Sequence, residues 1–150
     1  MNRFYDIPFI PSRELLPWES AKRGLDVQIG QFENMERWRF RSDIAGGDIW
    51  IESGEVSDLA SIPSIIEWAA MPSDDQRIAG GAWVHDKLFR AGGKILVTTP
   101  SGIIGTVALS FAECNAILVD EAMPDLGASK FDRWKVLTGL RIGGRRNFKN

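Results

Sequence analysis

The hydrophobic pattern of this chain changes period near residue 60, and that change constrains the fold more than any other feature. Before it, apolar and polar residues alternate in short runs at residues 26–29, 37–41 and 48–51, as they do in half-buried strands. The last two runs are separated by Ala45-Gly46-Gly47, which is typical of a turn. After residue 60 the period lengthens to that of an α-helix. We therefore predict an α+β fold, in which a small antiparallel N-terminal sheet packs with three to four C-terminal helices.

The starts of the helices are marked by serines. In three places a serine is followed three residues later by Glu or Gln, which is the pattern of a capping box. A further helix is predicted to begin near Ser129, and residues 92–102 predict a loop or a short hairpin strand. The three capping boxes are Ser64 with Glu67, Ser73 with Gln76, and Ser110 with Glu113.

The chain has the size of one ordinary domain. Its 150 residues are 44% hydrophobic and include six tryptophans, which is enough for a core. We predict a single domain over residues 1–150, with an extended, β-rich part (1–60), a mainly helical part (61–145) and a basic tail (146–150). The lone Cys114 cannot form an internal disulfide, which favours a cytoplasmic origin. We expect neither a signal peptide nor a membrane anchor, because no window reaches roughly 18 apolar residues.

His85 is the only histidine in the chain, so it must carry any chemistry that needs an imidazole titrating near neutral pH. Zinc sites usually need more His and Cys ligands than this chain has, and common nucleotide-binding and serine-hydrolase motifs are missing. Helical spacing predicts that His85 points inward and that Asp86 lies on a neighbouring face. The next helix could set Asn115 against His85. The two predicted stripes are Ile78, Ala82, His85 and Phe89, and Phe111, Asn115, Leu118 and Ala122.

Two readings of Asp58 are open. It can accept backbone N–H bonds in a turn before a short helix that Ser61 caps. Alternatively, it can orient His85 or bind a cation, and Asp58 and Asp86 are then candidate ligands of Ca²⁺. A further hypothesis is that Cys114 and His85 form a nucleophilic pair. The alternative is that Cys114 is simply a small buried apolar residue.

The C-terminal end is locally basic, although the net charge of the chain is -2. This basicity indicates either a solvated helix face or a surface for a partner. Nucleic acid is disfavoured as that partner by the acidic overall charge. Residues 130–150 hold Lys130, Arg133, Lys135, Arg141, Arg145, Arg146 and Lys149 against Asp132 alone, and the candidate partner surface consists of Trp134, Arg141, Arg145 and Arg146.

Four motifs in this order resemble an uncharacterised family encoded by tailed phages and prophages, the domain-of-unknown-function family 1353. They are Asp58-Leu59-Ala60-Ser61-Ile62-Pro63, His85-Asp86-Lys87-Leu88-Phe89, Asn115-Ala116-Ile117-Leu118 and Leu140-Arg141-Ile142-Gly143-Gly144. The resemblance implies a phage or prophage source. The chain departs from the family pattern at Phe89, where a Tyr is usual, and at Asn115, where an Asp is usual.

The helix motif also resembles that of phospholipase A2. That resemblance implies His85 as general base for a water, Asp86 as a calcium ligand, and Asn115 in the place of the carboxylate that orients the histidine. An amide can hold the ring but cannot stabilise an imidazolium as a carboxylate does. The glycine-rich calcium loop of the phospholipases is missing from this sequence.

Two functions follow as hypotheses. The first is a non-enzymatic virion-associated or accessory structural protein of the tail-region type, in which His85, Asp86, Asp58 and Asn115 form a buried polar network. Its partners would be other phage proteins or further copies of the chain, in the virion or the host cytoplasm, and it would need no cofactor. The second is a small hydrolase, with or without Ca²⁺, that acts on a lipid or cell-wall ester or amide. The sequence leaves open whether the chain is an enzyme.

Overall fold

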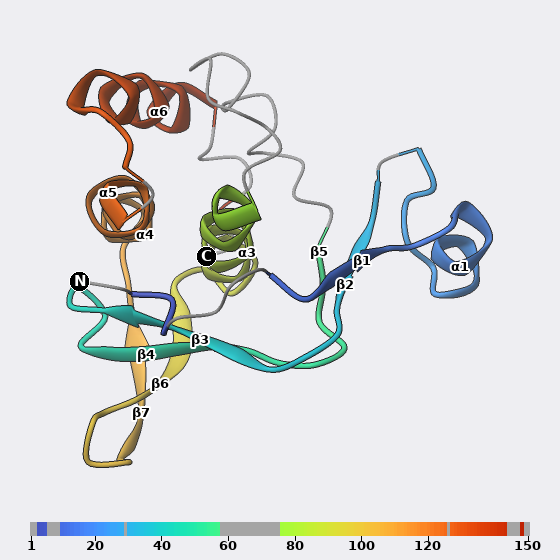
Figure 1. Ribbon diagram of the computed structural model, residues 1–150, viewed down its shortest axis with the longest axis horizontal. Helices are drawn as coiled ribbons and strands as arrows, with labels where there is room; N and C mark the ends of the chain where they lie inside the picture. The colour runs from blue at the N-terminus through green and yellow to red at the C-terminus, as the bar shows by residue number, and fades with distance from the viewer. Residues whose placement is uncertain are drawn as a thin grey trace.

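The computed structural model describes residues 3–5, 10–28, 30–57, 76–125, 127–143 and 148. Two antiparallel sheets and a layer of helices make up this part of the chain (Figure 1). The mixed α+β class is therefore confirmed. The predicted boxes at Ser64 and Ser73, and the Asp58 motif, lie outside the described residues.

The smaller sheet has the strand order β1-β2-β5, formed by Ser12–Glu14, Phe32–Asn34 and Val56–Ser57. Helix α1 (Pro17–Lys22) follows β1 and lies at the far end of the long axis of the molecule. The strand predicted at residues 26–29 is wrong for the described residues 26–28, which form a turn. There the backbone N–H of Gln28 donates to Asp26 Oδ1 at 2.9 Å, because an Asp side chain competes for local backbone donors.

The larger sheet has the order β3-β4-β6-β7. Strands β3 (Trp38–Ser42) and β4 (Gly47–Ile51) form the predicted hairpin. Strands β6 (Lys94–Thr98) and β7 (Ile104–Ala108) form a second hairpin from the part of the chain expected to be mainly helical. The sheet therefore takes two of its strands from each half of the sequence.

Within the described residues, a layer of helices covers one face of the larger sheet (Figure 1). Helix α3 (Gln76–Arg90) is followed, after the second hairpin, by α4 (Phe111–Ala116), the π-helix η1 (Ile117–Ala122) and α5 (Met123–Asp125), which run on without a break. Helix α6 (Lys130–Gly143) packs on η1 and lies outermost.

Two of the serine starts are confirmed. Ser110 accepts from the backbone N–H of Glu113, whose carboxylate accepts from the N–H of Ser110. Ser129 Oγ accepts from the backbone N–H of Asp132 at the start of α6.

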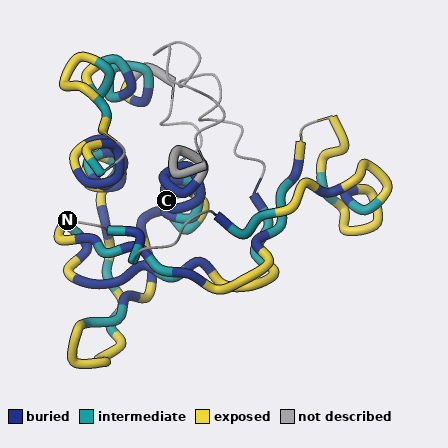
Figure 2. Tube along the Cα trace, in the orientation of Figure 1, coloured by how far each residue is buried: buried dark blue, intermediate teal, exposed yellow. Residues whose placement is uncertain are grey.

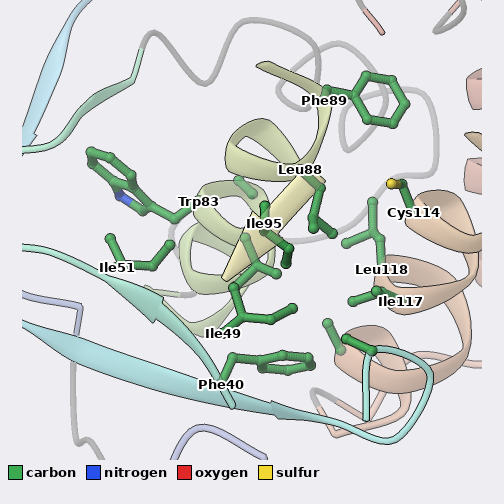
Figure 3. Close-up of a cluster of buried hydrophobic side chains, with 14 of the residues drawn as sticks. Phe40, Ile49, Ile51, Trp83, Leu88, Phe89, Ile95, Cys114, Ile117 and Leu118 are labelled. Carbon is green, nitrogen blue, oxygen red and sulfur yellow. The ribbon is translucent and has the colours of Figure 1, made fainter. Parts of the chain in front are cut away.

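The hydrophobic core lies between the larger sheet and the helices. Strand β3 shows why, because Trp38, Phe40 and Ser42 are buried while Arg39 and Arg41 between them face the other side. Figure 3 shows side chains of β3 and β4 pointing towards those of α3 and η1. The labelled core residues are Phe40, Ile49, Ile51, Trp83, Leu88, Phe89, Ile95, Cys114, Ile117 and Leu118.

Candidate functional site

His85 and Asn115 meet in the interior, between α3 and α4. Both are 1% exposed, and His85 Nε2 lies 3.2 Å from Asn115 Oδ1. Because an amide oxygen only accepts, Nε2 carries the proton and Nδ1 presents a lone pair. The ring of Phe89 lies against the imidazole, at 4.0 Å between centroids. The predicted contact between His85 and Asn115 is confirmed, and the chemical role of the pair stays a prediction.

The imidazole is held neutral by its surroundings. Burial lowers the pKa of His85 to about 4, an effect that the hydrogen bond with Asn115 opposes only in part. Within the described part of the chain, Nδ1 has no hydrogen-bond partner. A general base works best with a pKa near the operating pH and within reach of its proton. His85 is therefore a weak, enclosed base in this structure.

Asp86 lies on another face of α3, as its position in the sequence predicted. Its side chain is 13% exposed and forms an ion pair with Arg90, with 3.0 Å between Arg90 Nε and Asp86 Oδ2. Ser57 Oγ of β5 donates to the same carboxylate at 2.7 Å. These contacts link α3 to the smaller sheet. The described contacts of His85 and Asp86 are thus made to different partners on different faces.

A pocket of about 310 Å³ lies beside Asp86, between α3 and the segment that leads into β5. Its charges are arranged in pairs. Lys87 Nζ donates to Glu55 Oε1 at 2.7 Å and to the carbonyl of Trp50, and Arg90 Nη1 donates to the carbonyl of Val56 at 2.9 Å. The pocket is lined by Glu55, Val56, Trp83, Asp86, Lys87, Arg90 and Ala91.

Of these lining residues, only Asp86 is a candidate site residue predicted from the sequence. A usable signal was present, because Trp83, Lys87 and Arg90 recur at helical spacing on one side of α3. The indole N–H of Trp83 is buried and finds no hydrogen-bond acceptor among the described residues. Glu55 and Val56 come from a part of the chain about thirty residues away, which no local pattern could have linked to α3.

The calcium site predicted at Asp58 and Asp86 stays a prediction. Within the described residues, no three His, Cys, Asp or Glu side chains converge as a metal site requires. The guanidinium of Arg90 supplies the countercharge of Asp86, and a cation beside it would be repelled. Asp58, the other candidate ligand, lies outside the described residues.

Cys114 is a thiol in the core. It is 0% exposed, and burial, followed by the charge of Glu113, raises its pKa to about 12. Since the thiolate is the nucleophile, the raised pKa and the burial of Cys114 disfavour a nucleophilic role at neutral pH. Its surroundings favour a packing role.

Part of the predicted partner surface lies on α6. Trp134 is 59% exposed and Arg141 is also exposed. Arg145 and Arg146 lie outside the described residues.

The fold and the site define an α+β protein with an enclosed His–Asn pair beside a pocket of paired charges. A family model described as protein of unknown function (DUF1353) matches residues 32–139, well over half of the chain. The chain belongs to this family, in agreement with the motif resemblance. No curated protein and no solved structure matches it. Among the described residues, no helix is long and apolar enough to cross a membrane.

Proposed function

We propose that the chain is a non-enzymatic, phage- or prophage-encoded structural or accessory protein of the virion, of the tail-region type. The phage source rests on the motif resemblance. The observation that carries the non-enzymatic role is the enclosure of His85, because the only imidazole of the chain is neutral, 1% exposed and bonded to Asn115.

The polar residues of α3 have packing partners that suit such a role. His85 ties α3 to α4 through Asn115, and Asp86 ties α3 to β5 through Ser57. A buried polar contact with satisfied geometry favours one packing arrangement over others. In this proposal the motif residues keep three elements in register, and partner proteins bind at exposed surfaces away from these residues.

The alternative proposal is a small hydrolase, with or without Ca²⁺, acting on a lipid or cell-wall ester or amide. One observation favours it, namely the lone pair of His85 Nδ1, which has no partner in the described residues. Its weakness is the lowered pKa and enclosure of the ring.

A hydrolysis assay separates the two proposals. Wild-type protein, His85→Gln and Asp86→Asn would be incubated with phospholipid vesicles, a chromogenic ester and cell-wall fragments, each with Ca²⁺ and with a chelator. We expect no turnover above buffer from any of them. If the wild type hydrolyses a substrate and folded His85→Gln does not, the hydrolase proposal replaces ours. If that activity is also lost in the presence of the chelator, the hydrolase depends on Ca²⁺.

Particle association tests the virion role itself. Particles from an induced lysogen that encodes the chain would be purified on a density gradient and probed with an antibody against it. We expect the chain to follow the particles at a constant ratio to the capsid protein. Recovery in the soluble lysate alone would overturn the virion role.

A further inference from the structure

The outer face of α6 exposes two large aromatic side chains. Phe131 is 63% and Trp134 is 59% exposed, and their rings are stacked with 6.1 Å between centroids and 17° between planes. On the opposite side of the helix, Val136 and Leu140 are buried in the core. Figure 2 shows α6 at the periphery of the molecule, with exposed residues along it. Exposed aromatic pairs of this kind usually mark contact sites.

Positive charge surrounds this aromatic pair. Lys130 and Arg141 are exposed on the same side of α6, and Lys135 Nζ lies 4.5 Å from the centre of the Phe131 ring. Helical geometry places these cations and both aromatics within an arc of about 140°. The two other charges of α6 lie outside this arc, where Asp132 accepts from Ser129 Oγ and Arg133 pairs with Asp120.

The complement of this face is an anionic surface. We call this side of the helix the α6 face and define it as the residues Lys130, Phe131, Trp134, Lys135 and Arg141. Three cations and no carboxylate lie on it. The net charge of the whole molecule is nevertheless -2, so attraction to an anionic surface would orient the molecule with α6 towards it.

The shape and chemistry of the α6 face favour lipid over other anionic partners. Trp and Phe partition into the interfacial region of a bilayer, while Lys and Arg remain with the headgroups. A helix side on the periphery can lie on a flat membrane without a matching groove. Nucleic-acid bases also stack on exposed aromatic rings, so DNA is included in the binding test.

We propose that the α6 face binds the surface of a membrane that contains anionic phospholipid, with Phe131 and Trp134 at the interface and the three cations on the headgroups. This is a peripheral contact, made by a helix that keeps its buried side on η1. It goes beyond the proposed virion role and does not depend on it.

Vesicle sedimentation tests the proposal with the full chain. The vesicles would consist of phosphatidylcholine alone or of phosphatidylcholine mixed with phosphatidylglycerol. We expect binding to the mixed vesicles only, and a decrease in binding as NaCl is raised. Each cation near an anionic bilayer contributes about fivefold to partitioning, so Lys130→Gln/Lys135→Gln/Arg141→Gln should weaken binding by about 100-fold.

The aromatic contribution has a matched control. Trp134→Ala should weaken binding to the mixed vesicles by about tenfold, since it removes an apolar side chain from the interface. Trp18→Ala, at a residue that is 65% exposed on α1, should leave binding unchanged, as should Lys94→Gln on β6. Thermal melts would establish that all variants are folded.

Three outcomes would overturn the proposal. The first is that the wild type binds both kinds of vesicle equally or binds neither. The second is that Trp18→Ala and Trp134→Ala weaken vesicle binding equally. The third is salt-sensitive binding to DNA without binding to vesicles. None of them bears on the hydrolysis or particle assays.

Discussion

At the scale of single residues, burial decides the chemistry of His85. A free histidine titrates near neutral pH, but this ring sits between Phe89 and Asn115 with its pKa lowered to about 4. The charged form loses more hydration on burial than one hydrogen bond returns. The residue that most suggests catalysis in the sequence is therefore enclosed and uncharged at neutral pH in the structure.

This burial predicts a pH-dependent stability that His85→Gln removes. The pKa of His85 falls from 6.5 to about 4 on folding. As the pH is lowered, His85 is therefore protonated in the unfolded chain before it is protonated in the folded one. The stability that neutral His85 contributes is complete above pH 6.5 and is lost as the pH falls towards 4. Between neutral pH and about pH 4.5 we expect the wild type to lose roughly 2 to 3 kcal/mol more than His85→Gln.

Urea unfolding of both proteins at several pH values would measure this difference. Gln serves as the comparison because its amide can still donate to Asn115 and does not titrate. Since there is no other histidine, carboxylates dominate the remaining pH dependence and are shared by both proteins. Parallel stability profiles for the two proteins would contradict the buried, neutral state of the ring.

At the scale of elements, the π-helix η1 places a carboxylate in the interior. Every residue of η1 except Asp120 is buried, and Glu121 is 4% exposed. Its carboxylate accepts from Ser42 Oγ at 2.6 Å and from the backbone N–H of Asp43 at 2.7 Å, and Arg3 Nη1 lies 3.0 Å away. Single π-turns are often found where a helix must present a particular side chain. Here η1 joins the helical layer to the end of β3.

We therefore expect Glu121→Gln to destabilise the protein by about 2 kcal/mol, because it weakens both hydrogen bonds and, within the described residues, leaves Arg3 only its ion pair with the exposed Asp43. Asp120→Asn is the matched control on the same turn. Asp120 is 58% exposed in its ion pair with Arg133, so its loss should cost about 0.5 kcal/mol or less. Equal losses of unfolding free energy in urea would show that the Glu121 contacts do not hold the layers together.

At the scale of the whole molecule, the junction at Gly93 joins the helical layer to the larger sheet. The N–H of Gly93 donates to Leu88 O in α3 at 2.9 Å, and its carbonyl accepts from Leu109 N after β7 at 2.8 Å. The backbone has a φ of 78°, and a Cβ on Gly93 would lie 1.9 Å from Leu109 O. Only glycine fits, because both the dihedral and the close approach exclude a side chain.

Gly93→Ala should consequently destabilise the protein by about 3 kcal/mol or more. An alanine would be strained at this positive φ, and its methyl group would push the start of β6 away from the end of β7. Gly102→Ala separates the two causes, since Gly102 also has a positive φ but has open space around its Cβ position. The Gly102→Ala variant should lose about 1 kcal/mol of unfolding free energy. Comparable unfolding midpoints for the two variants would mean that the junction relaxes and that the close approach is not limiting.

The sequence by itself determined the features that depend on neighbours along the chain. The change of hydrophobic period predicted the α+β class, and the Ser110 and Ser129 patterns predicted where two helices begin. Helical spacing also predicted that His85 and Asn115 point inward, and both are buried. These properties are accessible because caps and amphipathic faces are set by residues a few positions apart.

The tertiary structure decided what depends on residues far apart in the chain. The pairing of β6 with β4 and the pocket between Glu55 and Lys87 join segments separated by more than thirty residues. Asp86 was predicted to act with His85, yet its described contacts are with Arg90 and Ser57. Contacts of this kind have no local signature, because they are selected by the packing and charge balance of the whole fold rather than by the period of any one segment.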